Sequence, residues 1–157
     1  MFGHPHVVAL EARPANIEGA GRVSVQELVR QALRMRPDRL AVGEVRGAEV
    51  VDLLASLNTG HEGGCGTLHA NSSRDVPARI EALALAAGLG REAAHSQLAA
   101  GLDVVLHVDR ATRRVSEIAV PVRGADGLVS MALALSSGPD GEVRRGPGHE
   151  RLSRVLA

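Results

Sequence analysis

The stretch GHEGGCGTLHANS, residues 60–72, holds three side chains that could do chemistry together. His61, Cys65 and His69 follow one another at intervals of four residues. Three such groups could in principle bind zinc, but a tetrahedral site needs fixed geometry and usually a fourth ligand. The glycines between them give no rigid frame, so we predict no metal here. For Cys65, an inert thiol packed in a strand is favoured over a nucleophile, which needs a base and a lowered pKa.

A second chemical segment is RLAVGEVRG, residues 39–47. Glu44 comes directly after a short apolar run, and Arg46 follows two residues later. In parallel α/β sheets, ligands bind beyond the carboxyl ends of the strands. A carboxylate at that place can orient a water or reach Mg²⁺ through its hydration shell. The alternative is a surface glutamate paired with an arginine.

The two segments support each other. TLHAN, residues 67–71, also ends a short strand in polar residues. If the two strands are neighbours, Glu44 and His69 point into one crevice, where a histidine can donate a hydrogen bond to an anion. The alternative is a structural histidine whose hydrogen bonds are satisfied within the fold, and the pattern alone leaves the two hypotheses even.

The elements that must position these residues can be predicted from periodicity. Ser24 followed by Glu27 is a capping-box pattern, and the apolar positions after it fall on one helical face. Strands and helices then alternate, which implies a largely parallel α/β sheet. The expected strands are residues 6–12, 39–45 and 64–70, and three of the expected helices are residues 25–36, 74–87 and 91–100. A further helix, which Gly60 ends, is expected between the second and third strands, with Val50, Val51, Leu53, Leu54 and Leu57 on its buried side.

The pattern changes near residue 103. Residues 103–123 alternate around a polar turn and predict a β-hairpin. Residues 127–135 fit one further strand, and the Gly/Pro/Arg-rich segment after them predicts a flexible tail with a short helical end. We therefore divide the chain into a main domain, residues 1–123, and a weakly structured extension, residues 124–157.

Composition excludes several functions. All 18 basic residues are arginine, and they balance 18 acidic residues to a net charge of zero. That balance argues against a nucleic-acid binder, as does a single Phe, which leaves no aromatic platform for bases. Because lysine is absent, no phosphate-binding loop of the form G-x-x-x-x-G-K-[ST] occurs among these residues. With one cysteine and no apolar run long enough for a membrane span, we expect a cytoplasmic protein.

Residues 33–75, LRMRPDRLAVGEVRGAEVVDLLASLNTGHEGGCGTLHANSSRD, closely resemble the type II/type IV secretion ATPases, and the Flp (tight-adherence) pilus assembly branch is the most similar. The segment AVGEVRG resembles that family's Walker B motif, with Gly43 in place of the usual aspartate and Glu44 at the catalytic glutamate. The segment TGHEGGCGTLHANS resembles its histidine box, with His61 and His69.

The resemblance extends over about residues 5–123, and Arg13 and Arg34 stand at basic positions of the family pattern. It implies a RecA-like P-loop NTPase core in which Glu44 and His69 are catalytic. The residues expected at the nucleotide or the subunit interface are Gly43, Arg46, His61, Thr67, Arg13 and Arg34.

The family implies more about the assembly. Its members form hexameric rings that use ATP and Mg²⁺ between subunits. They drive pilus assembly or secretion through a platform protein at the inner membrane. We therefore expect a location peripheral to the inner face of the cytoplasmic membrane, a homo-oligomer, and glycine-rich histidine-box segments that respond to the γ-phosphate or to the neighbouring subunit.

The sequence departs from this family in one respect. The Walker A loop and the acidic box that precede Walker B in the family have no counterpart here, so the chain resembles the second half of a motor core. We expect no ATPase activity from it alone. A truncated gene, a split gene whose partner supplies the N-terminal half, and a decayed remnant remain open, as do a non-enzymatic scaffold and, more weakly, a zinc hydrolase using His61, Cys65 and His69.

Overall fold

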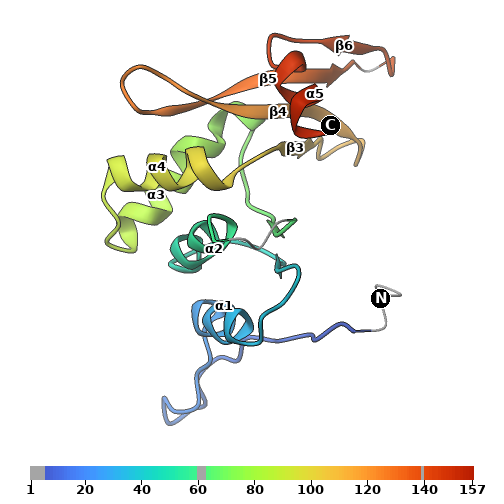
Figure 1. Cartoon of the computed structure of the whole chain (residues 1–157). Helices are drawn as coiled ribbons and strands as arrows, with labels where there is room; N and C mark the ends of the chain where they lie inside the picture. The colour runs from blue at the N-terminus through green and yellow to red at the C-terminus, as the bar shows by residue number, and fades with distance from the viewer. Residues whose placement is uncertain (1–5, 60–62, 139) are drawn as a thin grey trace.

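The computed structural model describes residues 6–59, 63–138 and 140–157. Helices dominate the first part of the chain, and a four-stranded antiparallel sheet dominates the last part (Figure 1). In chain order the elements are α1 (Val25–Arg34), β1 (Ala41–Val42), α2 (Glu49–Leu57), β2 (Cys65–Gly66), the 3₁₀ turn η1 (Ser73–Asp75), α3 (Val76–Ala86), α4 (Arg91–Gly101), β3 (Val105–Val108), β4 (Val115–Arg123), β5 (Val129–Ser137), β6 (Val143–Arg145) and α5 (His149–Val155).

Helix α1 begins at the predicted capping box. The backbone N–H of Glu27 donates to Ser24 Oγ at 3.2 Å, and the backbone N–H of Ser24 donates to Glu27 Oε2 at 2.7 Å. These two bonds satisfy donors that a helix start otherwise leaves free. The helix is tied to α2 by Asp52, which accepts from Arg30 Nε at 2.9 Å and from Gln26 Nε2 at 2.8 Å.

Strands β1 and β2 pair in parallel, with Ala41 opposite Cys65 and Val42 opposite Gly66. The predicted adjacency of these two strands is therefore confirmed. The parallel sheet expected for residues 6–100 is confirmed only for this pair, which is two residues long. The four described strands after residue 103 form a separate antiparallel sheet.

The strand predicted at residues 6–12 does not form. Val7, Val8 and Leu10 are about half exposed, and among the described residues the one ladder contact nearby is an isolated bridge between Arg13 and Val23. A strand needs a partner edge, and none of the strands in the described ranges lies beside this segment. Its apolar alternation alone is not sufficient.

The strand predicted near residues 127–135 is confirmed as β5, and the short helical end is confirmed as α5. The prediction that residues 124–157 are weakly structured, with a flexible segment before that helix, is corrected. Strand β5 pairs with β4 from Glu117↔Ser136 to Arg123↔Val129, and β6 extends the sheet beyond it. Gly146 and Gly148 donate backbone hydrogen bonds to Ala134 and Leu133, each at 2.9 Å. A Cβ on Gly148 would lie 2.6 Å from the carbonyl oxygen of Ala132. These glycines permit close packing of α5 on the sheet rather than flexibility.

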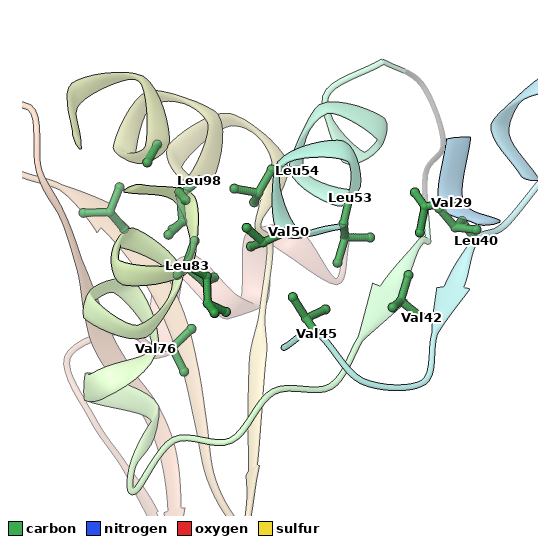
Figure 2. Packing of buried hydrophobic residues seen from close by; sticks show 14 residues of the cluster. Val29, Leu40, Val42, Val45, Val50, Leu53, Leu54, Val76, Leu83 and Leu98 are labelled. Carbon is green, nitrogen blue, oxygen red and sulfur yellow. The ribbon is translucent and has the colours of Figure 1, made fainter. Parts of the chain in front are cut away.

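Two hydrophobic clusters hold the molecule together. The larger one joins α1, α2, α3 and α4 to the residues around β1, and Figure 2 shows its buried side chains. The smaller one contains Val120, Ala134 and Leu152 and fixes α5 on β4 and β5. None of the helices in the described ranges combines the length and apolar character that a membrane crossing requires.

Candidate functional site

The turn after β1 is held by a glutamate that sequence patterns did not single out. Glu49, the first residue of α2, is 7% exposed, and its Oε1 accepts from the backbone N–H of Arg46 at 2.6 Å and of Gly47 at 2.9 Å. A carboxylate at a helix start also meets the positive end of the helix dipole. The signal was an acidic residue in the first turn of a helix. Glu49 therefore fixes the loop that carries Glu44 and Arg46.

The segments after β1 and β2 are joined beyond the short ladder. The backbone N–H of Val45 donates to the Thr67 carbonyl at 2.7 Å, and the N–H of Thr67 donates to the Val42 carbonyl at 3.3 Å. Thr67 Oγ1 donates to the carbonyl of Gly43 at 2.5 Å. These bonds hold the two polar segments side by side at the carboxyl ends of the strands, where ligands of α/β sheets bind.

Glu44 is the centre of the site. Its Oε1 lies 2.7 Å from His69 Nε2 and 2.5 Å from Arg46 Nε. Both distances are those of ion pairs, but neither contact has the angles of a hydrogen bond, and no donor among the described residues is aligned with this buried oxygen. The Arg46 guanidinium, and to a smaller extent His69, keep the pKa of the Glu44 carboxyl below its usual value. Glu44 is therefore ionised near neutral pH. The predicted proximity of Glu44 and His69 is confirmed.

The exposure of the three side chains differs. The side chain of Glu44 is 29% exposed, whereas those of Arg46 and His69 are 72% and 83% exposed. The carboxylate thus sits at the base of the cluster, while the two nitrogen-bearing groups face solvent. Such a cluster can offer donors to an anion and, next to them, an acceptor for a water molecule.

The segment that follows His69 is anchored to the antiparallel sheet. Ser73, which is buried, donates through its backbone N–H at 2.9 Å and through Oγ at 2.6 Å to Glu117 Oε2 on β4. Donation from Ser73 lowers the pKa of Glu117. Sequence patterns gave no sign of this contact, because the two residues are 44 positions apart.

The structure brings Gly43, Glu44, Arg46, Thr67 and His69 together. It does not bring Arg13 or Arg34 to them: no hydrogen bond or ion pair in the described ranges joins either arginine to Glu44. Arg13 Nε donates instead to the Gly21 carbonyl at 2.8 Å, and Arg34 is exposed in the last turn of α1. His61 lies outside the described residues.

Cys65 corrects another prediction. It was expected to pack inside a strand, but in the structure it is exposed, as is the other residue of this two-residue strand. Within the ranges that the structure describes, no group of three His, Cys, Asp or Glu side chains gathers as a metal site would require. The zinc hypothesis also needs His61, which is not described.

The fold and the site define a mixed α/β protein with a carboxylate and an imidazole in contact at the ends of two parallel strands. The sequence model of the family described as type II/IV secretion system protein matches residues 4–126. This chain therefore belongs to the type II/IV secretion ATPase family.

Curated relatives agree with the family. A putative conjugal transfer protein of Mycobacterium tuberculosis (strain H37Rv) is 67% identical over 129 residues, which is 80% of this chain and 36% of the relative. The probable conjugal transfer protein TrbB of Sinorhizobium fredii is 35% identical over 67% of this chain and 32% of its own length. The type IV secretion system protein PtlH of Bordetella pertussis is 35% identical over 72% of this chain and 36% of its own length. The chain thus spans about a third of the length of these relatives.

Proposed function

We propose that this chain forms the part of a secretion or pilus-assembly ATPase that carries the catalytic carboxylate. The observation that carries the proposal is the contact of Glu44 with His69 and Arg46 at the carboxyl ends of β1 and β2. The family membership adds that such proteins act in secretion systems. We propose further that the ATPase belongs to the Flp (tight-adherence) pilus assembly branch of the family.

The residues present fit a nucleotide phosphate with its magnesium ion. Arg46 and His69 are exposed and can donate to phosphate oxygens, and Glu44 is kept ionised by Arg46. When bound, ATP supplies the phosphoanhydride bond, and Mg²⁺ neutralises the charge of its phosphates. Glu44 accepts a hydrogen bond from the attacking water or from a water of the Mg²⁺ shell. His69 donates toward the terminal phosphate, and Thr67 holds the Gly43 carbonyl in place.

We further propose that turnover needs a hexamer and a phosphate-binding loop from the portion of a family polypeptide that lies outside the matched third. The 157 residues contain no lysine and hence no loop of the Walker type. In a ring, Arg13 and Arg34 would act from a neighbouring subunit, since no hydrogen bond or ion pair among the described residues joins them to Glu44 within one chain. A platform protein at the inner membrane is the proposed partner, which would place the machine at the cytoplasmic face of that membrane.

The test combines this chain with the portion of the Mycobacterium tuberculosis relative outside the match, produced as a separate polypeptide. We expect ATP hydrolysis by the mixture and none by the chain alone. Glu44→Gln should lower the turnover number by about 10²–10⁴-fold, the range for loss of a general base, with little change in nucleotide affinity. Glu92→Gln, an exposed substitution on α4, is the matched control and should leave turnover unchanged.

A non-enzymatic scaffold is the alternative. It would give a mixture that assembles but does not hydrolyse ATP, or one in which Glu44→Gln and Glu92→Gln behave alike. Either result would refute a catalytic role for Glu44.

A further inference from the structure

A buried histidine joins the helices α3 and α4 to the antiparallel sheet. These two helices pack against each other and against β5, and α4 also contacts β4 (Figure 1). His95, on α4, lies between these elements, and its side chain is 5% exposed. A buried imidazole needs a hydrogen-bond partner for each ring nitrogen, and both partners are present here.

The two ring nitrogens of His95 have partners of opposite kinds. Nδ1 lies 2.8 Å from the backbone nitrogen of Val129, the first residue of β5. Because a backbone N–H can only donate, Nδ1 accepts this hydrogen bond and carries no proton. Nε2 lies 2.9 Å from Oε2 of Glu81 on α3, a carboxylate that accepts, so the ring proton is on Nε2. The neighbours therefore fix His95 as the neutral Nε2–H tautomer.

The N–H of Val129 points away from β4. The carbonyl of Leu128, in the same peptide unit, accepts from the N–H of Gly124, directly after β4, and the two groups of a peptide unit point in opposite directions. Strand β6 borders β5 on this other side, but among the described residues it pairs only with residues 135–137. Val129 is 5% exposed, so this N–H would be buried and unpaired without His95.

The other side of the imidazole is held by charge. Arg91, one turn before His95 on α4, places Nε 3.2 Å from Glu81 Oε1. The hydrogen bond from His95, with the charge of Arg91 as a smaller cause, keeps the pKa of the Glu81 carboxyl below its usual value. Glu81 therefore stays a carboxylate in mildly acidic solution, where it can accept from an imidazolium as well as from a neutral imidazole.

The other titratable side chains on the elements around His95 are bonded elsewhere or exposed. Strand β5 contains none, and Arg79 on α3 and Glu92 on α4 are exposed. The described groups on α2, on β4 and in the turn before β5 pair as follows: Glu49 with the backbone of Arg46 and Gly47, Asp52 with Gln26 and Arg30, Glu117 with Ser73, Arg123 with Gly127, and Asp126 with Leu128. A proton taken up at this junction therefore binds Nδ1 of His95.

We propose that His95 is a pH-sensitive switch that holds α3 and α4 on β5 while its imidazole is neutral and releases β5 when a proton from water binds Nδ1. An imidazolium is a donor at both nitrogens, so Nδ1–H would face the N–H of Val129, and that hydrogen bond is lost. The bond to Glu81 remains, so the ring stays with the helices.

The switch also concerns the candidate site. Helix α3 continues directly from η1, which follows the segment that carries His69. The bond from Val129 to His95 is therefore a further polar attachment of this part of the chain to the antiparallel sheet, besides the bonds from Ser73 to Glu117. Protonation of His95 would loosen one attachment and leave the other in place.

The test is NMR spectroscopy of the 157-residue chain at about pH 7.5 and about pH 5. Long-range ¹H–¹⁵N correlation should show His95 with a proton on Nε2 and none on Nδ1 at the higher pH. A free histidine has a pKa of about 6.5, and only the open junction takes up the proton. Protection of the Val129 amide, corrected for the intrinsic exchange rate, should therefore fall about 10–30-fold at the lower pH. The amide of Gly148, which donates to Leu133 elsewhere on β5, should change by less than about threefold.

Two substitutions separate the two sides of the switch. His95→Asn keeps an acceptor next to Cγ, where Nδ1 was, but cannot titrate, so protection of Val129 should change by less than about threefold between the two pH values. His95→Gln reaches toward Glu81 and leaves Val129 without an acceptor, so its amide should be about tenfold less protected at both pH values. His107→Asn, at a half-buried histidine on β3, is the matched control and should keep the parent's pH response.

Three outcomes would overturn the proposal: a proton on Nδ1 at about pH 7.5, equal loss of protection at Val129 and Gly148, or a pH response of His95→Asn like that of the parent. If neither His95 variant folds, the parent decides, because protection of Val129 that is constant with pH would refute the switch. No nucleotide is present in these measurements, so their result does not depend on the proposed ATPase activity.

Discussion

The parallel pair β1–β2 and the antiparallel pair β4–β5 hold their strands in different ways. The antiparallel strands are nine residues long and are joined along most of that length, whereas β1 and β2 contribute two residues each. The parallel pair depends instead on bonds outside the ladder, chiefly Thr67 to Gly43 and Glu49 to the turn before α2.

The candidate site therefore does not lie on the most extensively paired strands. The candidate site lies at the ends of the least paired strands, and its position depends on neighbouring elements: α2 beneath it and β4 through the Ser73–Glu117 contact. Segments that must bind and release a ligand are generally drawn from the less stable parts of a fold. The extended antiparallel sheet then holds the segment that carries the site in place, through the bonds from Ser73 to Glu117.

The largest expected effect tests whether the larger and the smaller hydrophobic cluster contribute differently to the free energy of unfolding. Leu98 is 1% exposed in the larger cluster, and Leu152 is 5% exposed in the smaller one. Leu98→Ala should lower the free energy of unfolding by about 4 kcal/mol and Leu152→Ala by about 2 kcal/mol, since α5 is short and can shift to fill the cavity. Urea denaturation followed by circular dichroism measures both. Equal losses would show that the buried leucines of the two clusters contribute equally to the free energy of unfolding.

The second effect concerns glycines, one from each region. A Cβ at Gly148 would meet the Ala132 carbonyl oxygen at 2.6 Å and Val120 Cγ2 at 2.9 Å, whereas a Cβ at Gly43 would meet nothing within 4 Å. Gly148→Ala should therefore destabilise the chain by about 1–3 kcal/mol through overpacking. Gly43→Ala should remain within about 0.5 kcal/mol of the parent. The same denaturation measurement decides, and a harmless Gly148→Ala would restore the flexible-tail interpretation.

Local signals explain what the sequence could predict. The capping box at Ser24, the apolar faces of the helices and the hairpin after residue 103 each depend on residues close in sequence, and each was predicted. The contact of Glu44 with His69 could be predicted as well, because parallel neighbours end at one edge of the sheet and both strands end in polar residues.

The features that the sequence did not predict correctly depend on contacts between residues far apart in the chain. Residues 6–12 alternate like a strand, but none of the described strands pairs with them. A glycine-rich segment near Gly148 packs tightly because an opposing backbone lies close. Glycine in a sequence permits both a flexible loop and a close approach, and only the partner decides between them. The bond from Ser73 to Glu117 could not be predicted for the same reason, since nothing local pairs β4 with the turn after β2.

The smallest expected effect tests the anchor between the two regions. Ser73 lowers the pKa of Glu117, so the bond contributes stability above the unfolded-state pKa of about 4.3, and this contribution is lost as pH falls through the lower folded-state pKa. Glu117→Gln should therefore lower the free energy of unfolding by about 1 kcal/mol at neutral pH, a value already reduced for the partial exposure of Glu117. Below about pH 4 the loss should be smaller. Glu142→Gln removes only an exposed ion pair with Arg144 and should change stability by less than about 0.5 kcal/mol at either pH. Denaturation of the three proteins at both pH values gives the comparison, and a Glu117→Gln loss that stays constant with pH would mean that the carboxylate charge does not hold the site segment to the sheet.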